Sequence, residues 1–410
     1  MNTQAHNEAY RRRDLPICLG VRFLSEASTL ALSVVIGWSV YKISQTPLTL
    51  GIVGIVEFIP AVLMTLPAGE LCDRLSPRPL VVTGLALQCC CALSFLALSL
   101  LHTKGLWLFY GVLLLLGTAR AIAEPAAQAL LPLLVPPDRL PRAVAASSTA
   151  WQMAVVLGPV VGGVCYAMGS SVAYLVCAFA FFAATAGAMT LCSQRSRRER
   201  LSLQGRIARV KEGFAFVRSE PVVLGALSLD LFAVLLGGAT ALLPVYAQDI
   251  LKMGPQGLGA LRSAPAVGAC LVGLVLTRFP PERNVGPKLF AAVIVFGVAT
   301  LVFAFSRSAW VSWLALAVVG ASDMVSVNIR TSLIQLATPD VMRGRVSAVN
   351  ALFIGASSEL GAFESGVTAA LLGTVPAVAL GGIGTIVAAA VWMFAFPAIR
   401  EADRIDIKLG

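Results

Sequence analysis

The sequence predicts an all-α integral membrane protein with twelve transmembrane helices arranged as two pseudo-repeated six-helix halves. Three observations support this fold class. Only 13% of the 410 residues are Asp, Glu, Lys or Arg, while 58% are hydrophobic, so there is too little charge to cover soluble domains. Twelve segments are long and apolar enough to cross a bilayer. The two halves of the chain also align with each other.

A bilayer core about 30 Å thick requires about 20 apolar residues in a helix. Such segments lie at residues 15–41, 47–70, 79–101, 105–135, 143–168, 171–192, 221–250, 255–278, 287–306, 309–337, 346–372 and 375–396. The first segment is longer than the apolar core of a signal peptide and contains Arg22 and Glu26. We therefore expect it to remain as the first membrane helix.

The distribution of basic residues predicts the orientation. With both termini placed in the cytoplasm, 23 Lys and Arg residues fall on the cytoplasmic side and four on the opposite side. By the positive-inside rule, this predicts a multi-pass protein of the plasma (inner) membrane with both termini cytoplasmic. Because topology accounts for the net charge of +10, we expect no nucleic-acid partner.

The longest hydrophilic segment, residues 193–220, divides the chain into an N-terminal half (1–192) and a C-terminal half (221–410). Its apolar residues at helical spacing are Leu203, Ile207, Val210, Phe214 and Val217. Two interpretations stay open for this segment, an amphipathic helix on the inner leaflet and a solvated linker.

An internal repeat relates the two halves. At an offset of 203 residues, GTARAIAEPAAQALLPLLVPPDRLPRAVAAS, from Gly117, aligns without a gap with GASDMVSVNIRTSLIQLATPDVMRGRVSAVN, from Gly320. The fourth and fifth spans therefore repeat as the tenth and eleventh. Parallel six-helix halves are typical of one large group of secondary transporters.

The turn between the second and third spans reads GELCDRLSPRPL, residues 69–80. Gly69 lets another helix approach closely, and Asp73 suits a helix N-terminus with free N–H groups. Arg74 and Arg78 can pair with carboxylates or lipid phosphates. Such a turn would close the inner side of a carrier whose halves rock against each other.

This turn resembles the loop 2–3 motif of the major facilitator superfamily, G-x-L-x-D-R-x-x-x-R, at Gly69, Leu71, Asp73, Arg74 and Arg78. The glycine that the motif has after Arg74 is missing. LGPVVGG in the fifth span is similar to the antiporter motif G-P-x-x-G-G, and the matching residues are Gly158, Pro159, Gly162 and Gly163. This motif has two open interpretations, helix packing and a role in keeping the resting carrier closed.

The runs EPAAQALLPLLVPPDRLPRA and TPDVMRGRVSAVN resemble the branch that contains bacterial enterobactin-type exporters and drug–proton antiporters. The resemblance implies a carrier that works by alternating access and exports small amphipathic molecules, a drug or a siderophore-like metabolite, in exchange for protons. It implies a small-molecule substrate, protons as the coupling ion and a lipid bilayer as partners. We expect a monomer.

Charged residues inside the predicted spans mark the candidate site, because each costs at least about 2.5–3.5 kcal/mol at mid-membrane if unpaired. They are Arg22, Glu26, Glu57, Arg120, Glu124, Asp230, Arg262, Asp323, Arg330, Glu359 and Glu364. They fall in the first, second, fourth, seventh, eighth, tenth and eleventh spans, whereas the third, sixth, ninth and twelfth spans have none away from their ends. In the resembling superfamily the first group of spans lines the central cavity and the second group faces lipid. Two interpretations stay open, ion pairs that only hold helices together and proton coupling or substrate contact.

Spacing suggests partners for some of these charges. Arg22 and Glu26 are four residues apart, as are Arg120 and Glu124, so each pair shares a helix face. Asp323 and Arg330, seven apart, also share a face. The carboxylates nearest mid-depth, and therefore the best proton carriers, are Glu26, Glu57, Asp230 and Asp323.

Other functions find less support in the sequence. A lysophospholipid or other metabolite carrier is an alternative on the same fold. A polytopic membrane enzyme would need clustered His, Asp or Ser chemistry, whereas the two histidines, His6 and His102, lie in a predicted tail and a short loop. The nine cysteines form no C-x-x-C pair. We therefore expect no enzymatic activity, no metal site and no cofactor.

The predicted orientation can be tested by labelling single cysteines in a cysteine-free background. A cysteine at Ser202 should react with a membrane-impermeant reagent only from the cytoplasmic side, and one at residue 103 only from outside. Labelling of position 202 from outside alone would contradict the orientation.

Overall fold

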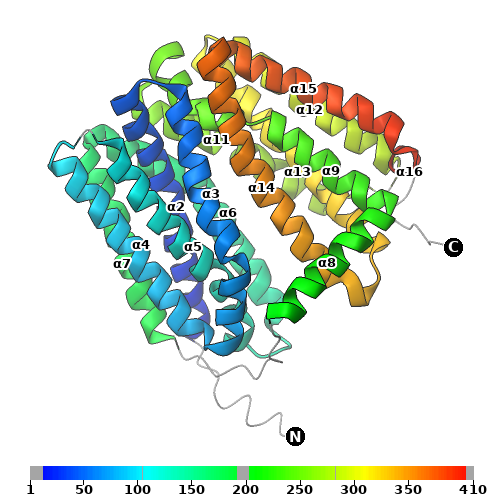
Figure 1. Ribbon diagram of the computed structural model, residues 1–410, viewed down its shortest axis with the longest axis horizontal. Helices are drawn as coiled ribbons and strands as arrows, with labels where there is room; N and C mark the ends of the chain where they lie inside the picture. The colour runs from blue at the N-terminus through cyan, green and yellow to red at the C-terminus, as the bar shows by residue number, and fades with distance from the viewer. Residues whose placement is uncertain (1–12, 104, 192–202, 282, 403–410) are drawn as a thin grey trace, which may run out of the picture. The chain divides into compact units, whose positions relative to one another are not determined.

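The computed structural model describes residues 13–103, 105–191, 203–281 and 283–402 (Figure 1). Within these ranges the chain is helical, and twelve spans are long and apolar enough to cross a membrane. The predicted fold class is thereby confirmed. Predicted and observed ends mostly differ by a few residues, and the tenth predicted span, 309–337, coincides with its helix.

Six helices form the first set of spans. They are α2 (Asp14–Ser44), α3 (Pro47–Arg74), α4 (Pro77–Leu100), α5 (Leu106–Leu134), α6 (Leu140–Met168) and α7 (Ser170–Thr190). The hydrophilic segment then contributes α8 (Leu203–Ser219), which shows that its second part is a helix.

The second set begins with α9 (Pro221–Leu236) and, after three short turns, continues through α11 (Gly254–Arg278). The remaining helices are α12 (Val285–Phe305), α13 (Ala309–Ala337), α14 (Asp340–Leu372), α15 (Thr374–Ala395) and the short α16 (Pro397–Arg400). The bounds of α5 and α13 differ by 203 residues at both ends, so the repeat extends from sequence to helix length.

The seventh span is interrupted, which the sequence analysis did not predict. A continuous span was expected over 221–250, but α9 ends at Leu236 and is followed by η1 (Ala239–Leu242), α10 (Leu243–Val245) and the wider π-turn η2 (Tyr246–Ile250). Gly237 and Gly238 lie at the interruption, and two adjacent glycines disfavour a helix. A Cβ atom on Gly238 would lie 2.6 Å from the carbonyl oxygen of Gly361 in α14.

The chain divides into two compact units. The first comprises Met1–Ser44, Val56–Leu203 and Pro255–Gly259, and the second comprises Gln45–Ile55, Gln204–Gly254 and Ala260–Gly410. The first turns of α3 thus belong to the second unit and the first turns of α11 to the first. The predicted division at residues 193–220 did not place parts of α3 and α11 in the other unit.

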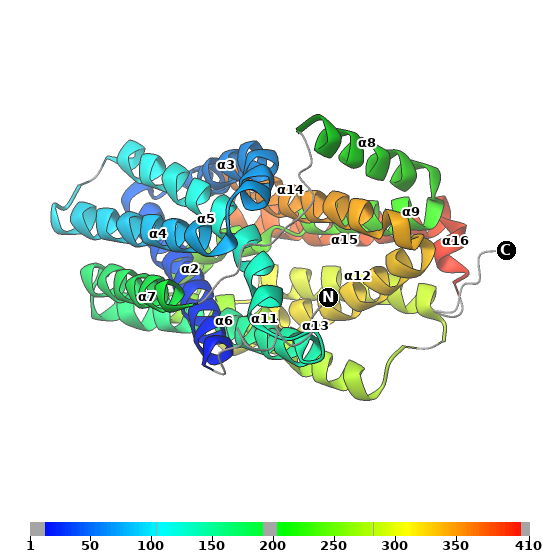
Figure 2. The same cartoon turned by 90° about the horizontal axis from the view of Figure 1, so that it is seen from below.

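In the first unit, α4 packs against both α5 and α7, as Figure 2 shows, and α2 packs against α6 and α7. Aromatic rings fill the contact between α4, α5 and α7, where Phe95 lies 5.7 Å from both Phe109 and Tyr174 between ring centroids. The Tyr174 hydroxyl donates a hydrogen bond to Ser39 Oγ of α2 at 3.0 Å. This network fixes α2 on its neighbours.

Two glycines of the LGPVVGG motif set the distance between α6 and α2. A Cβ on Gly158 would lie 2.7 Å from the carbonyl oxygen of Ala27, and one on Gly162 would lie 2.6 Å from that of Ala31. Because helices in lipid associate through close packing, small residues at the contact are required. The structure therefore supports the packing interpretation of this motif.

In the second unit, α12 lies against α13 and α15, and α9 contacts α13, α14 and α15. The linker helix α8 packs here as well. Val217 is buried, Gly213 approaches the backbone of Arg345, and Arg345 Nη1 forms an ion pair with Glu212 Oε2 at 2.8 Å. Contact of α8 with the lipid surface stays a prediction.

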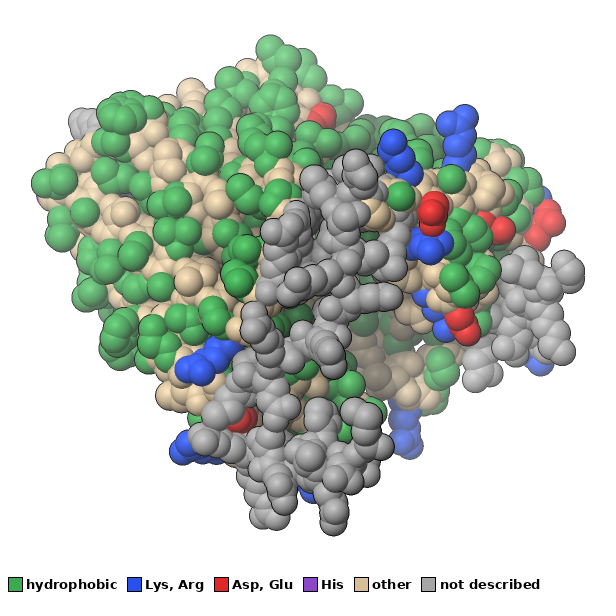
Figure 3. Space-filling view, turned by 60° about the horizontal axis from the view of Figure 1, so that its bottom comes forward, with side chains coloured by type: hydrophobic (Ala, Val, Ile, Leu, Met, Phe, Trp, Pro, Cys, Tyr) green, Lys and Arg blue, Asp and Glu red, His purple; other side chains and the backbone are tan. Residues whose placement is uncertain are grey.

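Hydrophobic side chains are spread over the described part of the face shown in Figure 3, while Lys, Arg, Asp and Glu occupy small areas of it. Large apolar residues are exposed along many helices, including Phe179 at 71% and Leu274 at 69%. Such a surface is expected where the surrounding medium is hydrocarbon, as the composition predicted.

The packing role of Gly162 can be tested with Gly162→Ala. The added methyl group should force α6 away from α2 and lower the melting temperature of the purified protein, since overpacking typically destabilises by about 1–3 kcal/mol. Gly111→Ala is the matched control, because a Cβ at Gly111 meets no atom within 4 Å. Equal melting temperatures for the two variants would contradict the packing role.

Candidate functional site

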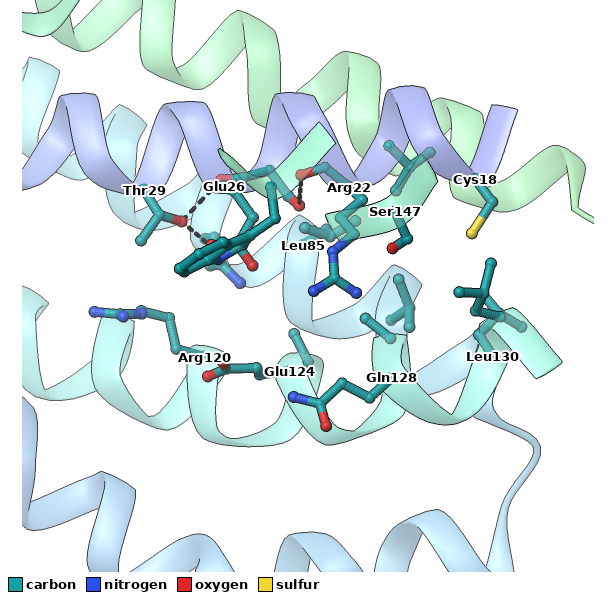
Figure 4. A pocket seen from close by; sticks show the side chains of 18 of the residues that line it. Cys18, Arg22, Glu26, Thr29, Leu85, Arg120, Glu124, Gln128, Leu130 and Ser147 are labelled. Atoms are coloured by element: carbon teal, nitrogen blue, oxygen red, sulfur yellow. Dashed lines mark hydrogen bonds between the residues drawn. The ribbon is translucent and has the colours of Figure 1, made fainter. Parts of the chain in front are cut away.

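A polar cavity lies within the first unit, among α2, α4, α5 and α6 (Figure 4). The polar and charged side chains that line it are Arg22, Ser25, Glu26, Thr29, Gln88, Arg120, Glu124, Gln128 and Ser147. Its apolar lining includes Val81, Leu85, Leu130, Leu131, Trp151 and Leu191. The cavity measures about 100 Å³, which is room for several water molecules.

The α2 wall of the cavity consists of residues one helical turn apart, Cys18, Arg22 and Glu26. Thr29 continues this face and donates a hydrogen bond through Oγ1 to the carbonyl oxygen of Ser25 at 2.9 Å. The same hydroxyl lies 3.4 Å from Gln88 Oε1 of α4, which links the two helices at the end of the cavity opposite Cys18.

The opposite wall is α5, where Arg120, Glu124 and Gln128 recur every fourth residue (Figure 4). Gly117, one turn earlier, lies so close to α3 that a Cβ would be 2.9 Å from the carbonyl oxygen of Glu57. This approach brings Arg120 Nη1 to 3.2 Å from Glu57 Oε2. Arg120 therefore pairs with a carboxylate on another helix, and no ion pair joins it to Glu124 among the described residues.

Arg22 differs from Arg120 in its partners. Its Nε atom is buried, and within the described part of the chain that atom has no hydrogen-bond partner. Nor do the described residues provide an ion pair to Arg22, although Glu26 is one turn away on the same helix. Glu26 lies near enough to Glu124, Arg120 and Arg22 for their charges to act on it.

A second cluster of charges lies in the second unit, between α9 and α13. Arg330 Nη1 forms an ion pair with Asp230 Oδ1, and the two side chains are only 8% and 9% exposed. Asp323, expected to face Arg330 from its spacing, lines a small cavity beside this pair. The cavity measures about 10 Å³, which is room for about one water.

The other predicted residues lie apart from these two clusters. Glu364 Oε1 accepts a hydrogen bond from Thr368 Oγ1 at 2.8 Å, which leaves it bound to its own helix. Arg262 and Glu359 belong to the second unit and both have interaction partners. The structure thus brings Arg22, Glu26, Arg120 and Glu124 together in one cavity, joins Glu57 to Arg120, and gathers Asp230, Asp323 and Arg330 in a second cluster.

The loop motif is described only in part. Arg78 donates a hydrogen bond from Nη2 to the carbonyl oxygen of Met189 at the end of α7, and Leu71 is half-buried. Gly69 and the side chains of Asp73 and Arg74 lie outside the described part of the structure. Closure of the inner side by this motif stays a prediction.

Several lining residues were missed in the sequence, and most carried a usable signal. Gln128 continues the four-residue spacing of Arg120 and Glu124, and Gln88 is an amide within an otherwise apolar span. The third span, expected to face lipid, contributes Gln88 and Leu85 to the cavity. Nothing in the sequence marked Trp151.

Comparison with known proteins identifies the fold. The family model described as Major Facilitator Superfamily matches residues 18–362. The uncharacterized MFS-type transporter YjbB of Bacillus subtilis (strain 168) is 26% identical over 286 residues, which cover 68% of this chain and 67% of that protein. A second Bacillus subtilis relative, the uncharacterized MFS-type transporter YvqJ, is 27% identical over 49% of this chain and 47% of its own length.

Solved structures agree on the fold. A crystal structure of the peptide transporter POT in complex with sulfate aligns with a TM-score of 0.76 at 12% identity, covering 98% of this chain and 100% of that one. A bacterial homologue of the human lysosomal transporter Spinster, in an inward-facing conformation, aligns with a TM-score of 0.72 at 12% identity, covering 98% of both chains.

The two ion pairs should differ in their contribution to stability. Arg330→Gln removes the cation from a buried pair, which typically destabilises by about 3–5 kcal/mol, whereas the Arg120 side chain is 40% exposed and its loss should matter less. The melting temperature should therefore fall more for Arg330→Gln than for Arg120→Gln. Arg278→Gln, at an exposed helix end, is the control, and a reversed order would contradict this ranking.

Proposed function

The chain belongs to the major facilitator superfamily, and we propose that it is a proton-coupled efflux carrier for small amphipathic molecules, such as a drug or a siderophore-like metabolite. The observation that supports this most is the cavity of the first unit, in which charged and apolar side chains meet inside a bundle of membrane spans. A concave site with a few polar groups in an apolar wall suits a small ligand.

The same cavity supports coupling to protons. Glu26 and Glu124 line it, and the described residues offer neither carboxylate an ion pair within 4 Å. A carboxylate that is not held by a fixed cation can exchange a proton for a cationic group of a substrate. We propose that Glu26, on the half-buried α2 face, is the group for which the proton and the substrate compete.

The remaining parts of the proposal follow from the sequence. We propose that the carrier belongs to the branch of enterobactin-type exporters and drug–proton antiporters. We place it in the plasma (inner) membrane as a monomer with both termini in the cytoplasm, on the basis of its basic residues. It transports its substrate unchanged and is not an enzyme.

Proton coupling can be tested in proteoliposomes with Glu26→Gln. Substrate movement driven by an imposed pH gradient should be abolished, because the amide cannot take up and release a proton, while binding of the substrate survives. Gradient-driven transport of a panel of candidate compounds, with binding measured separately, provides both readouts. Glu364→Gln is the matched control, since Glu364 lies outside the cavity.

The second cluster supplies the alternative outcome. If Glu26→Gln transports normally while Asp323→Asn does not, the coupling residue lies in the second unit. If each of the seven carboxylates inside the spans can be neutralised singly without loss of proton-driven transport, coupling through them is wrong.

A further inference from the structure

The charges of the cavity indicate the class of substrate. We propose that it binds a zwitterionic amphipath, in which an anionic group contacts Arg22, a nearby ammonium group contacts Glu26 and an apolar body lies on the leucine-lined wall. The transport of the bound molecule rests on the proposed function, but its binding does not.

Arg22 requires an anion that the described protein does not supply. The other two membrane arginines with defined partners, Arg120 and Arg330, each pair with a carboxylate from a neighbouring helix. Arg22 has a buried Nε without a hydrogen-bond partner, and Figure 4 shows its guanidinium group projecting into the cavity between α2 and α5. A planar guanidinium binds a carboxylate through two parallel hydrogen bonds, so a ligand carboxylate fits this position.

The two glutamates prevent a simple anion from being the preferred ligand. Arg120 is already engaged by Glu57, so Arg22, Glu26 and Glu124 are the charges left to meet a ligand. A molecule with only a negative charge would satisfy Arg22 but be repelled by two carboxylates. A molecule with only a positive charge would leave Arg22 without a partner.

The spacing limits how far apart the two charges of the ligand lie. Arg22 and Glu26 are one turn apart on α2, and side chains at that spacing have Cβ atoms about 5–6 Å apart. A ligand whose ammonium and anion are a few bonds apart, as they are in an amino acid, can therefore contact both side chains. Val81, Leu85 and Leu131 provide the apolar surface for the rest of the molecule.

The ammonium group of the ligand would also take part in proton exchange at Glu26. It and a proton would compete for the carboxylate oxygens of Glu26, while Glu124 is more exposed than Glu26. The charged groups that act on Glu26 are Glu124, Arg120 and Arg22. The anionic group of the ligand would neutralise the positive charge of Arg22 while the proton leaves Glu26.

Three probes with one carbon skeleton test the proposal on the purified full-length protein. They are 2-amino-4-phenylbutyrate, 4-phenylbutyrate and 4-phenylbutylamine, which present a zwitterion, an anion and a cation. Calorimetry gives affinity, and quenching of Trp151 fluorescence reports binding in this cavity, because Trp151 lines it. Trp151→Phe should remove the quenching that belongs to this cavity.

The zwitterion should bind the wild-type protein most tightly. Arg22→Gln should weaken its binding about ten- to a hundred-fold, the effect of losing a charged hydrogen bond, and leave the affinity for 4-phenylbutylamine unchanged or higher. Arg22→Lys should restore part of the loss. Arg278→Gln, which removes the same charge at an exposed helix end, should bind all three probes as the wild type does.

Three results would overturn the proposal. The wild type could bind the amine or the anion as tightly as the zwitterion, Arg22→Gln could weaken all probes equally, or the zwitterion could fail to bind at millimolar concentration. Failure of the proposed function can be distinguished from failure of this proposal, since the predicted order of affinities could hold without transport driven by a pH gradient. Conversely, proton-driven transport restricted to molecules without an anionic group would refute this inference alone.

Discussion

The free-energy cost of a charge in hydrocarbon governs the interior of this molecule. An arginine inside a span is tolerated when a carboxylate from another helix reaches it, and Arg330 with Asp230 shows that solution in its most buried form. The pair joins α9 to α13, and its two side chains are only 8% and 9% exposed. An arginine that lacks such a partner must meet water or a ligand. Arg22 is in that position, and the cavity around it is where the fold departs from full pairing.

Close packing of the helices determines where that cavity lies. In lipid, helices are held together by van der Waals contact and hydrogen bonds more than by the hydrophobic effect, so backbones must approach closely. Gly158 and Gly162 allow this for α6 on α2, and Gly117 allows it for α5 on α3. The same helices carry charged residues, Arg22 on α2 and Arg120 on α5, and the approach at Gly117 brings Arg120 to Glu57 of α3. The glycine contacts therefore position the polar groups without taking part in their chemistry.

The sequence predicted the spans, the repeat and the set of membrane charges because each depends on local composition or on alignment of the chain with itself. It could not predict which charges pair. Spacing along one helix suggested Glu124 as the partner of Arg120, but the chosen partner, Glu57, is set by how closely α3 approaches at Gly117. The interruption after Leu236 was missed because hydropathy over 221–250 is continuous, although Gly237 and Gly238 mark the place in the sequence.

The repeat also shows how the two halves have become different. At the offset of 203 residues that relates α5 to α13, Arg120 corresponds to Asp323, so equivalent positions carry opposite charges. At the same offset Glu124 corresponds to Val327 and Arg22 would correspond to Gly225, so these two charges of the first half have no charged counterparts in the second. In the second half Asp230 and Asp323 instead line a cavity of about 10 Å³, and Asp230 is paired with Arg330. One scaffold therefore holds two environments, a larger cavity in which Arg22 has no ion pair among the described residues, and a smaller one beside an arginine that is already paired.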